Sequence, residues 1–111
     1  MPETISFGDF QKMDIRIAKI ESAEMVEDTD KLLKLGVNIG EKEEKRTLVA
    51  GIADVYNPDE LVGKNIVVLA NLEPKAIRGI ESKGMLLAAD VDGKAVLLTP
   101  DKEVEPGAEV R

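Results

Sequence analysis

Residues 57–70, NPDELVGKNIVVLA, place a helix start directly before an unbroken apolar run. Asn57 is a good helix cap, Pro58 suits the first helical position, and Glu60 supplies an acid at the third. The glycine that follows ends this helix within two turns. Residues 66–70 are rich in β-branched side chains, which predicts a strand buried on both faces at the centre of the fold.

Strand signals also precede this stretch. Residues 13–20 alternate apolar and polar side chains, and the alternation changes phase after Ala18, as in a long strand with a bulge or bend. Residues 33–39 alternate again. A charged, solvated connection at 40–46 then predicts a hairpin that returns through residues 47–53.

Three more features follow the stretch. Residues 71–83, NLEPKAIRGIESK, predict a long irregular connection, and such connections in small domains are usually functional. Residues 84–89 predict another apolar strand. An Asp-Gly pair at 92–93 is a strong signal for a two-residue hairpin turn, which returns the chain into residues 95–98. The chain beyond is rich in turns and charge.

This order of elements decides the fold class. Five main strands, a short helix between the third and the fourth, and an added C-terminal hairpin strand indicate an all-β protein with a five-stranded OB-fold barrel. The length of 111 residues fits a single domain, residues 1–111, and an apolar fraction of 43% supports a packed core.

The composition excludes most catalytic chemistry. The chain has no Cys and no His, so it lacks cysteine nucleophiles, thiolate zinc ligands, the commonest metal ligand and the commonest general base. It carries no phosphate-binding glycine motif, and its acid pairs at 43–44 and 59–60 fall in solvated turns. We therefore expect a protein that is not an enzyme, with no metal and no cofactor. No apolar run has signal-peptide or membrane-span length, which predicts a cytoplasmic protein without a membrane partner.

The charge is unevenly distributed along the chain. The protein has 15 Lys and Arg against 22 Asp and Glu, a formal net charge of −7. Residues 64–85 hold four basic and two acidic residues, whereas the blocks 1–30, 31–63 and 86–111 are each net acidic. The basic block contains the long connection at 71–83. These cations either only solvate the loop or bind an anionic partner.

Several motifs together resemble the tRNA-binding domain family. They are DIRIAKI at 14–20, DKLL at 30–33, VAGIA at 49–53, PDELVGK at 58–64, NLEPK at 71–75, Arg78-Gly79, Ser82 and GMLLAA at 84–89. The resemblance covers nearly the whole chain. The family includes the C-terminal domain of dimeric methionyl-tRNA synthetases, its free-standing counterparts, and the EMAP II and Arc1p proteins. The similarity is greatest to the free-standing β subunit, because Met1 stands almost directly before the domain.

The resemblance implies a non-catalytic OB-fold module that binds tRNA by shape and pairs into a homodimer. It implies a role as the β subunit, or a trans-acting tRNA-binding factor, of methionyl-tRNA synthetase, whose catalytic subunit is then a partner. Dimeric export chaperones that bind extended peptides share the same domain and are the alternative. The DKLL run and Ser82 with Gly84-Met85 favour the tRNA-binding interpretation.

The scarcity of aromatic residues indicates how such a module would hold RNA. Sequence-tolerant binders of single strands stack bases on aromatic side chains, and this chain has only Phe7, Phe10 and Tyr56. A generic single-strand binder is therefore disfavoured, and we expect phosphate and sugar contacts to a folded RNA. Lys75 and Arg78 are the candidates for the phosphates, and the planar fork of arginine matches two oxygens.

Five further residues complete the candidate tRNA-binding site. Lys31 ranks second by the family pattern, and Lys83 belongs to the same basic connection. Ser82 either caps the loop with its hydroxyl or reaches a ribose or phosphate oxygen. Met85 either joins the core or makes an adaptable contact with a base. Asn71 is expected to support the loop through bonds to the backbone rather than to bind RNA.

Two apolar segments are not needed by a five-stranded barrel. One is the hairpin strand at 95–98, and the other is the N-terminal segment with Ile5, Phe7 and Phe10. Either the hairpin is a flap on its own barrel, or both segments pack across a two-fold axis in a homodimer. A homodimer would display two basic loops on one particle and so increase avidity.

Overall fold

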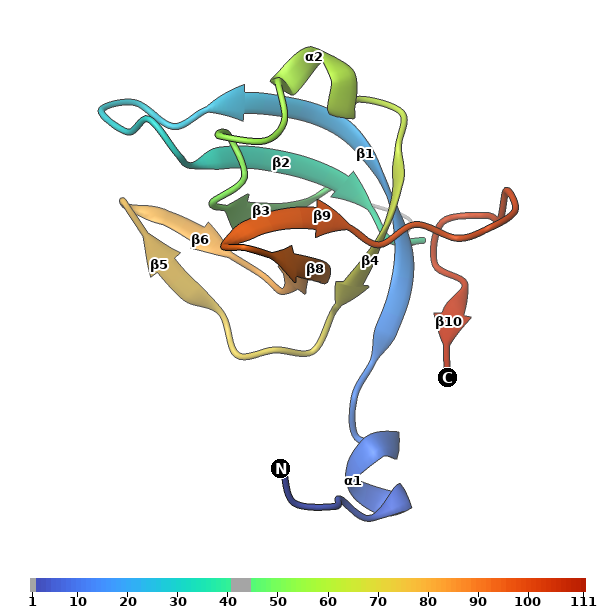
Figure 1. Ribbon diagram of the computed structural model, residues 1–111. Coiled ribbons are helices and arrows are strands. Elements are labelled where there is room, and N and C mark those ends of the chain that lie inside the picture. The colour runs from blue at the N-terminus through green and yellow to red at the C-terminus, as the bar shows by residue number, and fades with distance from the viewer. Residues whose placement is uncertain (1, 41–44) are drawn as a thin grey trace.

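Strand β1 (Ile15–Met25) is the longest element of the computed structural model, which describes residues 2–40 and 45–111. Its first half pairs with β4 (Asn65–Leu69), and its second half pairs with β2 (Leu33–Asn38), both antiparallel. The register shifts between Ile20 and Ser22, which confirms the predicted bulge or bend. Figure 1 shows β1 curving along the whole height of the barrel.

The barrel is closed by contacts between β3 (Arg46–Ala50) and the segment before β7 (Met85–Leu86). The sheet order is β3-β2-β1-β4-β7. The amide of Lys83 donates to the carbonyl of Thr47 at 2.9 Å. The hydroxyl of Ser82 accepts from the amide of Val49 and donates to the carbonyl of Gly84, both at 3.1 Å. The result is the nearly closed five-stranded, OB-like barrel that the order of elements predicts.

Helix α2 (Pro58–Leu61) lies over one end of the barrel, between β3 and β4, as predicted (Figure 1). The amide of Asn57 donates to the carboxylate of Glu60 at 3.1 Å, so this acid holds the first turn. Leu61, the last residue of α2, is completely buried and belongs to the hydrophobic core. The carbonyl of Ile20 accepts from the amide of Gly63, and the amide of Ile20 donates to the carbonyl of Lys64. The loop after α2 is therefore bonded to the bulge of β1.

The core contains the inward residues of the five barrel strands. The largest completely or almost completely buried side chains are Ile20, Leu33, Leu35, Ile39, Leu48, Leu61, Ile66, Val37, Val49 and Val68. The prediction that residues 66–70 are buried on both faces is wrong, because Val67 and Leu69 are only half-buried. Strand β4 therefore has one core face and one face that no other layer fully covers.

The predicted irregular connection at 71–83 is instead a β-hairpin. Its strands are β5 (Lys75–Ile77) and β6 (Ile80–Ser82), joined by the two-residue turn Arg78-Gly79. Both turn residues have positive φ, 52° and 79°, as the tightest hairpin turns require. Glycine adopts this conformation readily, whereas arginine rarely does, so the Arg-Gly pair gave only a weak turn signal.

A second hairpin follows, made of β8 (Ala88–Val91) and β9 (Lys94–Leu97). Its turn at Asp92-Gly93 confirms the prediction. The single strand expected over 84–89 is divided into β7 and β8 at Leu87, whose amide donates to Val67. Leu97 is buried in the core, so this hairpin packs on its own barrel, as the flap interpretation requires. Its outer face still exposes three large apolar side chains, Val91, Val96 and Leu98.

The C-terminus returns to the barrel through β10 (Glu109–Val110), which the sequence did not predict. Strand β10 pairs with Ile15 and Arg16, on a part of β1 that β2 does not reach. Ile17 reinforces this contact, because its amide donates to Ala108 and its carbonyl accepts from Gly107. The charged tail thus protects an otherwise open edge of β1.

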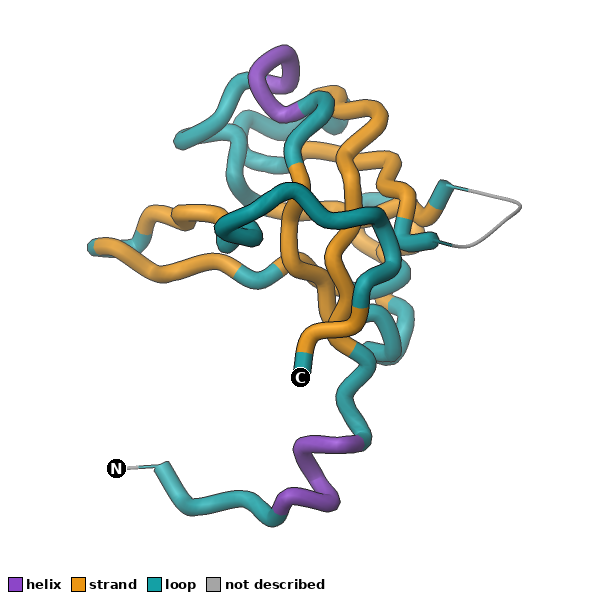
Figure 2. The backbone as a smooth tube through the Cα atoms, turned by 90° about the vertical axis from the view of Figure 1, so that its right-hand side faces the viewer, coloured by secondary structure: helices purple, strands orange, loops and turns teal. Residues whose placement is uncertain are grey.

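Helix α1 (Phe7–Gln11) precedes β1 and extends away from the barrel in both Figure 1 and Figure 2. The hydroxyl of Ser6 caps it by accepting from the amide of Asp9 at 3.0 Å. Within the described residues, neither this helix nor any other is long and apolar enough to cross a membrane. The acid pair at 43–44 and most of the connection expected at 40–46 lie outside the described residues.

Ser82→Ala tests the bond that closes the barrel. The substitution removes the hydroxyl that accepts from the buried amide of Val49, so we expect a loss of about 1–3 kcal/mol in the free energy of unfolding. A domain of this size loses about 4–8 °C in melting temperature for each kcal/mol. Glu81→Ala, on the exposed face of the same strand, is the matched control and should change stability by less than about 0.5 kcal/mol. Equal melting temperatures for the two variants would contradict this role of Ser82.

Candidate nucleic-acid interface

The β5–β6 hairpin carries the basic residues that the sequence singled out. Lys75 begins the hairpin, Arg78 occupies its tip, and Lys83 follows its last strand; all three are exposed. Among the described residues, neither Lys75 nor Arg78 forms an ion pair. Their charges are therefore available to an anionic partner.

The structure brings Lys31 close to the hairpin tip, although the two are far apart in the sequence. Lys31 and Arg78 line one shallow hollow, together with the turn between β1 and β2. Asp28 and Asp30 line it as well, so the two cations do not make a purely basic surface. The two cations attract a phosphate that approaches this hollow, and the two aspartates repel it. This balance limits where the backbone of an RNA can pass.

A basic groove that the sequence analysis missed lies between the hairpin and the outer face of β2 and β3. Its cationic lining comes from Lys34, Lys45, Arg46 and Lys83. The outer face of the second and third strands, together with the loops beside it, is where OB folds bind oligonucleotides. The alternation of residues 33–39 places Lys34 on that face, so this signal was present in the sequence, but the block-by-block charge count did not detect it.

The three lysines of this groove form weak surface ion pairs with neighbouring glutamates. Lys34 lies 3.7 Å from Glu24, Lys45 lies 4.0 Å from Glu21, and Lys83 lies 3.6 Å from Glu81. These side chains are 36–69% exposed, and ion pairs of this kind contribute little to stability. A phosphate can replace each carboxylate at small cost.

Arg46 has a different role in the groove. Its guanidinium donates to the carbonyl of Ala70 and, at 3.4 Å, to that of Lys83. It therefore joins the two ends of the segment that contains the hairpin. This contact fixes the base of the hairpin against β3.

The structure places Ser82 and Asn71 in supporting positions. Ser82 is 3% exposed and both of its hydrogen bonds are internal, which favours the loop-capping interpretation over a ribose contact. The carboxamide of Asn71 accepts from the amide of Asp14 at 2.9 Å and donates to the carbonyl of Lys12 at 2.6 Å. Asn71 thus fastens the segment between α1 and β1 to the start of the hairpin connection.

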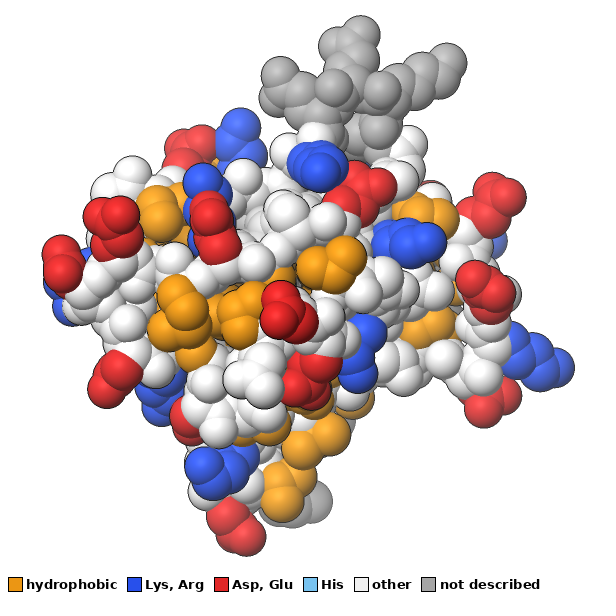
Figure 3. Space-filling model, turned by 90° about the horizontal axis from the view of Figure 1, so that it is seen from above, with side chains coloured by type: hydrophobic (Ala, Val, Ile, Leu, Met, Phe, Trp, Pro, Cys, Tyr) orange, Lys and Arg blue, Asp and Glu red, His pale blue; other side chains and the backbone are white. Residues whose placement is uncertain are grey.

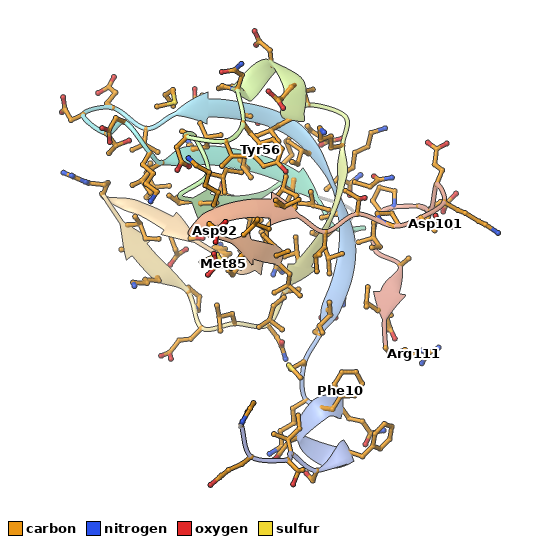
Figure 4. The ribbon with its side chains drawn as sticks, viewed as in Figure 1. Phe10, Tyr56, Met85, Asp92, Asp101 and Arg111 are labelled. Atoms are coloured by element: carbon orange, nitrogen blue, oxygen red, sulfur yellow. The ribbon has the colours of Figure 1, made fainter. Side chains whose placement is uncertain are left out.

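Met85 is neither a core residue nor fully exposed. It is half-buried at the start of β7 and lines a hollow beneath the hairpin with Lys75 and Ser82. Figure 4 shows Met85 near the base of the hairpin. The structure therefore brings Lys75, Ser82 and Met85 together on one side of the hairpin, while Lys31 and Lys83 lie in separate hollows that adjoin its tip and its second strand.

The face seen in Figure 3, above α2, shows acidic and basic side chains interspersed among small apolar patches. Within the described residues, no group of three or more acidic side chains is placed to hold a metal ion.

Known proteins of similar sequence and structure support a nucleic-acid role. The chain is 58% identical over 108 residues to the methionine–tRNA ligase of Archaeoglobus fulgidus. This match covers 97% of this chain and 16% of that protein. It thus spans about a sixth of the length of the curated relatives that it matches.

Two solved structures match almost the whole chain. A MetRS related protein from Pyrococcus horikoshii is 40% identical with a TM-score of 0.90, and the match covers 99% of this chain and 100% of that one. The chaperone CsaA of Bacillus anthracis is 30% identical with a TM-score of 0.87, and the match covers 98% of this chain and 100% of that one.

The family model described as "Putative tRNA binding domain" matches residues 15–109, from the start of β1 into β10. This match includes the barrel, the basic hairpin and every candidate binding residue. The chain therefore belongs to the tRNA-binding domain family and is related to the domain of this kind in methionyl-tRNA synthetases.

Proposed function

We propose that this protein binds folded tRNA through the β5–β6 hairpin and the adjoining groove, and that it serves methionyl-tRNA synthetase as a non-catalytic β subunit or trans-acting factor in the cytoplasm. The observation that carries the proposal is the position of the exposed Lys75 and Arg78 on a hairpin that borders the basic groove over the outer face of β2 and β3. That face is the nucleic-acid-binding surface of OB folds.

Recognition is directed by shape rather than by base sequence. None of the three aromatic residues lines the hollows beside the hairpin. The cations of the hairpin and the hollows beside it come from three separate segments of the chain, 31–34, 45–46 and 75–83. A tRNA whose phosphates match this spacing binds several of them at once, whereas an extended strand lacks the fixed geometry.

The partnership with a synthetase rests on the relatives. The chain is 58% identical to a segment of a methionine–tRNA ligase, and a MetRS related protein of the same extent has been solved as a separate chain. A tRNA-binding module held next to a catalytic subunit raises the local concentration of tRNA there. Such a module lowers the KM for tRNA without contributing a catalytic group.

A homodimer accounts for the apolar N-terminal segment. Ile5 is 63% exposed and Phe7 is 70% exposed, and α1 holds them away from the barrel. The cleft between α1 and β10 is also partly apolar, with Phe7, Phe10 and Val110 among its lining residues. A second copy related by a two-fold axis would cover these side chains and display two hairpins on one particle.

Lys75→Ala combined with Arg78→Ala tests the proposed phosphate contacts. The double variant should bind tRNA more weakly, and the slope of log affinity against log salt should become less negative by about 2, because two phosphate contacts are lost. A salt-dependent filter-binding titration measures both quantities. The matched control is Lys94→Ala with Lys102→Ala, which removes the same charge from exposed positions outside the hairpin and groove.

Control and test variants with the same salt slope would show that only total charge matters and would place the site elsewhere. Unchanged melting temperatures would confirm that neither pair of substitutions unfolds the barrel.

Phe7→Ser tests the homodimer. Removing this exposed ring from α1 should shift the molecular mass in sedimentation equilibrium from two chains toward one at micromolar concentration. Val62→Ser is the control, because Val62 is 53% exposed beside α2, at the opposite end of the barrel from α1. A parent protein that sediments as a monomer would exclude the dimer directly.

A peptide-binding chaperone is the second candidate function, because the chaperone CsaA of Bacillus anthracis shares the fold over the whole chain at 30% identity. The two functions predict opposite results. If the first is correct, the protein lowers the KM for tRNA of the methionyl-tRNA synthetase catalytic subunit and does not prevent aggregation of a chemically denatured protein. If the chaperone function is correct, it suppresses that aggregation and leaves aminoacylation kinetics unchanged.

A further inference from the structure

A largely apolar hollow of about 340 Å³ lies beneath the β5–β6 hairpin. Its lining residues are Leu72, Glu73, Pro74, Lys75, Ile77, Ser82, Gly84 and Met85. This volume is at the lower end of the range of small-molecule sites, so the hollow accepts one ring system and not an extended ligand. Phosphate binding by the hairpin's cations does not require such an apolar cavity.

The pairing of the hairpin orients its side chains toward this hollow. Lys75 and Ile77 share one face of β5 because alternate residues of a strand point the same way. Ser82 pairs with Lys75 across the hairpin, so it lies on that face too. The inner face of the hairpin thus has an apolar end at Ile77 and a cationic end at Lys75.

The floor of the hollow is fixed before any ligand arrives. The hydroxyl of Ser82 is bonded to Val49 and Gly84, which holds the turn before β7 against β3. Gly84 has a φ of +118°, and a Cβ at this position would lie 2.9 Å from the carbonyl oxygen of Leu69. The absence of a side chain at Gly84 therefore lets the turn pack closely, and Met85 is presented at a defined depth.

The charges around the hollow match a nucleotide better than an apolar side chain of a protein. Lys75 stands at its edge, and Arg78 and Lys83 belong to the same hairpin segment. Glu73 also lines the hollow, while Arg78 and Lys83 line neighbouring hollows. An apolar floor with the exposed Lys75 at its edge is complementary to a flat, weakly polar ring attached to a phosphate that reaches this lysine.

We propose that this hollow receives one unpaired nucleobase of the bound RNA. The thioether of Met85 and the ring of Pro74 pack against the base, and Lys75 contacts the phosphate attached to the same nucleotide. Sulfur and aromatic rings attract each other, so Met85 can contact an unpaired base of a folded RNA in the way that aromatic side chains contact bases in single-strand binders. This inference rests on the proposed function, because it assigns a subsite within the same RNA-binding face.

Methionine methyl NMR tests the inference on the unmodified protein. The protein is labelled with ¹³C at the methionine methyl groups, and Met85→Leu assigns the Met85 signal. Transcribed tRNA should move the Met85 signal upfield, because a stacked ring shields the methyl group. Met13 lies outside the hollows beside the hairpin and serves as the internal reference. A blunt RNA duplex without unpaired bases should leave Met85 unshifted.

The outcomes separate this inference from the proposed function. If tRNA binds with a steep salt dependence while the Met85 signal does not move, the base subsite is wrong and the phosphate site stands. If tRNA does not bind at any salt concentration, both are wrong. A Met85 shift caused by an unstructured peptide without aromatic residues, and not by RNA, would assign the hollow to a protein ligand.

Met85→Ala supplies an independent thermodynamic test. It should weaken tRNA binding by about two- to tenfold, the factor that corresponds to one sulfur–ring contact. It should leave the salt slope unchanged, whereas Lys75→Ala reduces that slope by about 1. Met85→Leu keeps the apolar volume but lacks the sulfur, so its affinity should lie between those of the parent protein and Met85→Ala. Full affinity of Met85→Ala, or a reduced slope with it, would overturn the assignment of Met85 to a base.

Discussion

The change of partner along β1 is the constraint on which the rest of the structure depends. One strand pairs with β4 over Ile15–Lys19 and with β2 over Lys19–Met25, so it must coil through the whole barrel. The bulge after Ile20 makes that bend possible, and the loop after α2 bonds both backbone groups of Ile20. The helix between β3 and β4 is therefore part of the barrel's corner, and the C-terminal β10 occupies the edge that the bend leaves open.

The same framework positions the basic hairpin. Arg46 and Ser82 bond its base to the closing strands, so its strands leave the barrel in a fixed direction while its tip stays exposed. Asn71 adds a second connection, from the hairpin to the segment behind α1. Because α1 carries the proposed dimer contact, this single carboxamide joins the surface that would pair two chains to the surface that would bind RNA.

The sequence predicts the barrel well because strand order, the helix start at Asn57 and the turn at Asp92-Gly93 are all local signals. It does not predict the β5–β6 hairpin, since Arg78 adopts a backbone conformation that arginine rarely takes. It also does not predict β10, whose two residues are too few for any periodicity. At the site, charge counting finds Lys75 and Arg78, which are close in sequence. It misses Lys34 and Lys45, because only the pairing of β2 with β3 brings these lysines beside the hairpin.

The net charge of −7 fits with RNA binding once the fold is known. A uniformly basic protein attracts RNA to every face and holds it in many orientations, since the electrostatic contribution is independent of sequence. Here most of the chain is acidic and repels RNA, while cations from the hairpin, Lys31 and the groove converge on one side. Each cation contributes modestly, so affinity depends on several phosphates fitting at once. That requirement, and not the strength of any single contact, is what selects a folded RNA over an arbitrary polyanion.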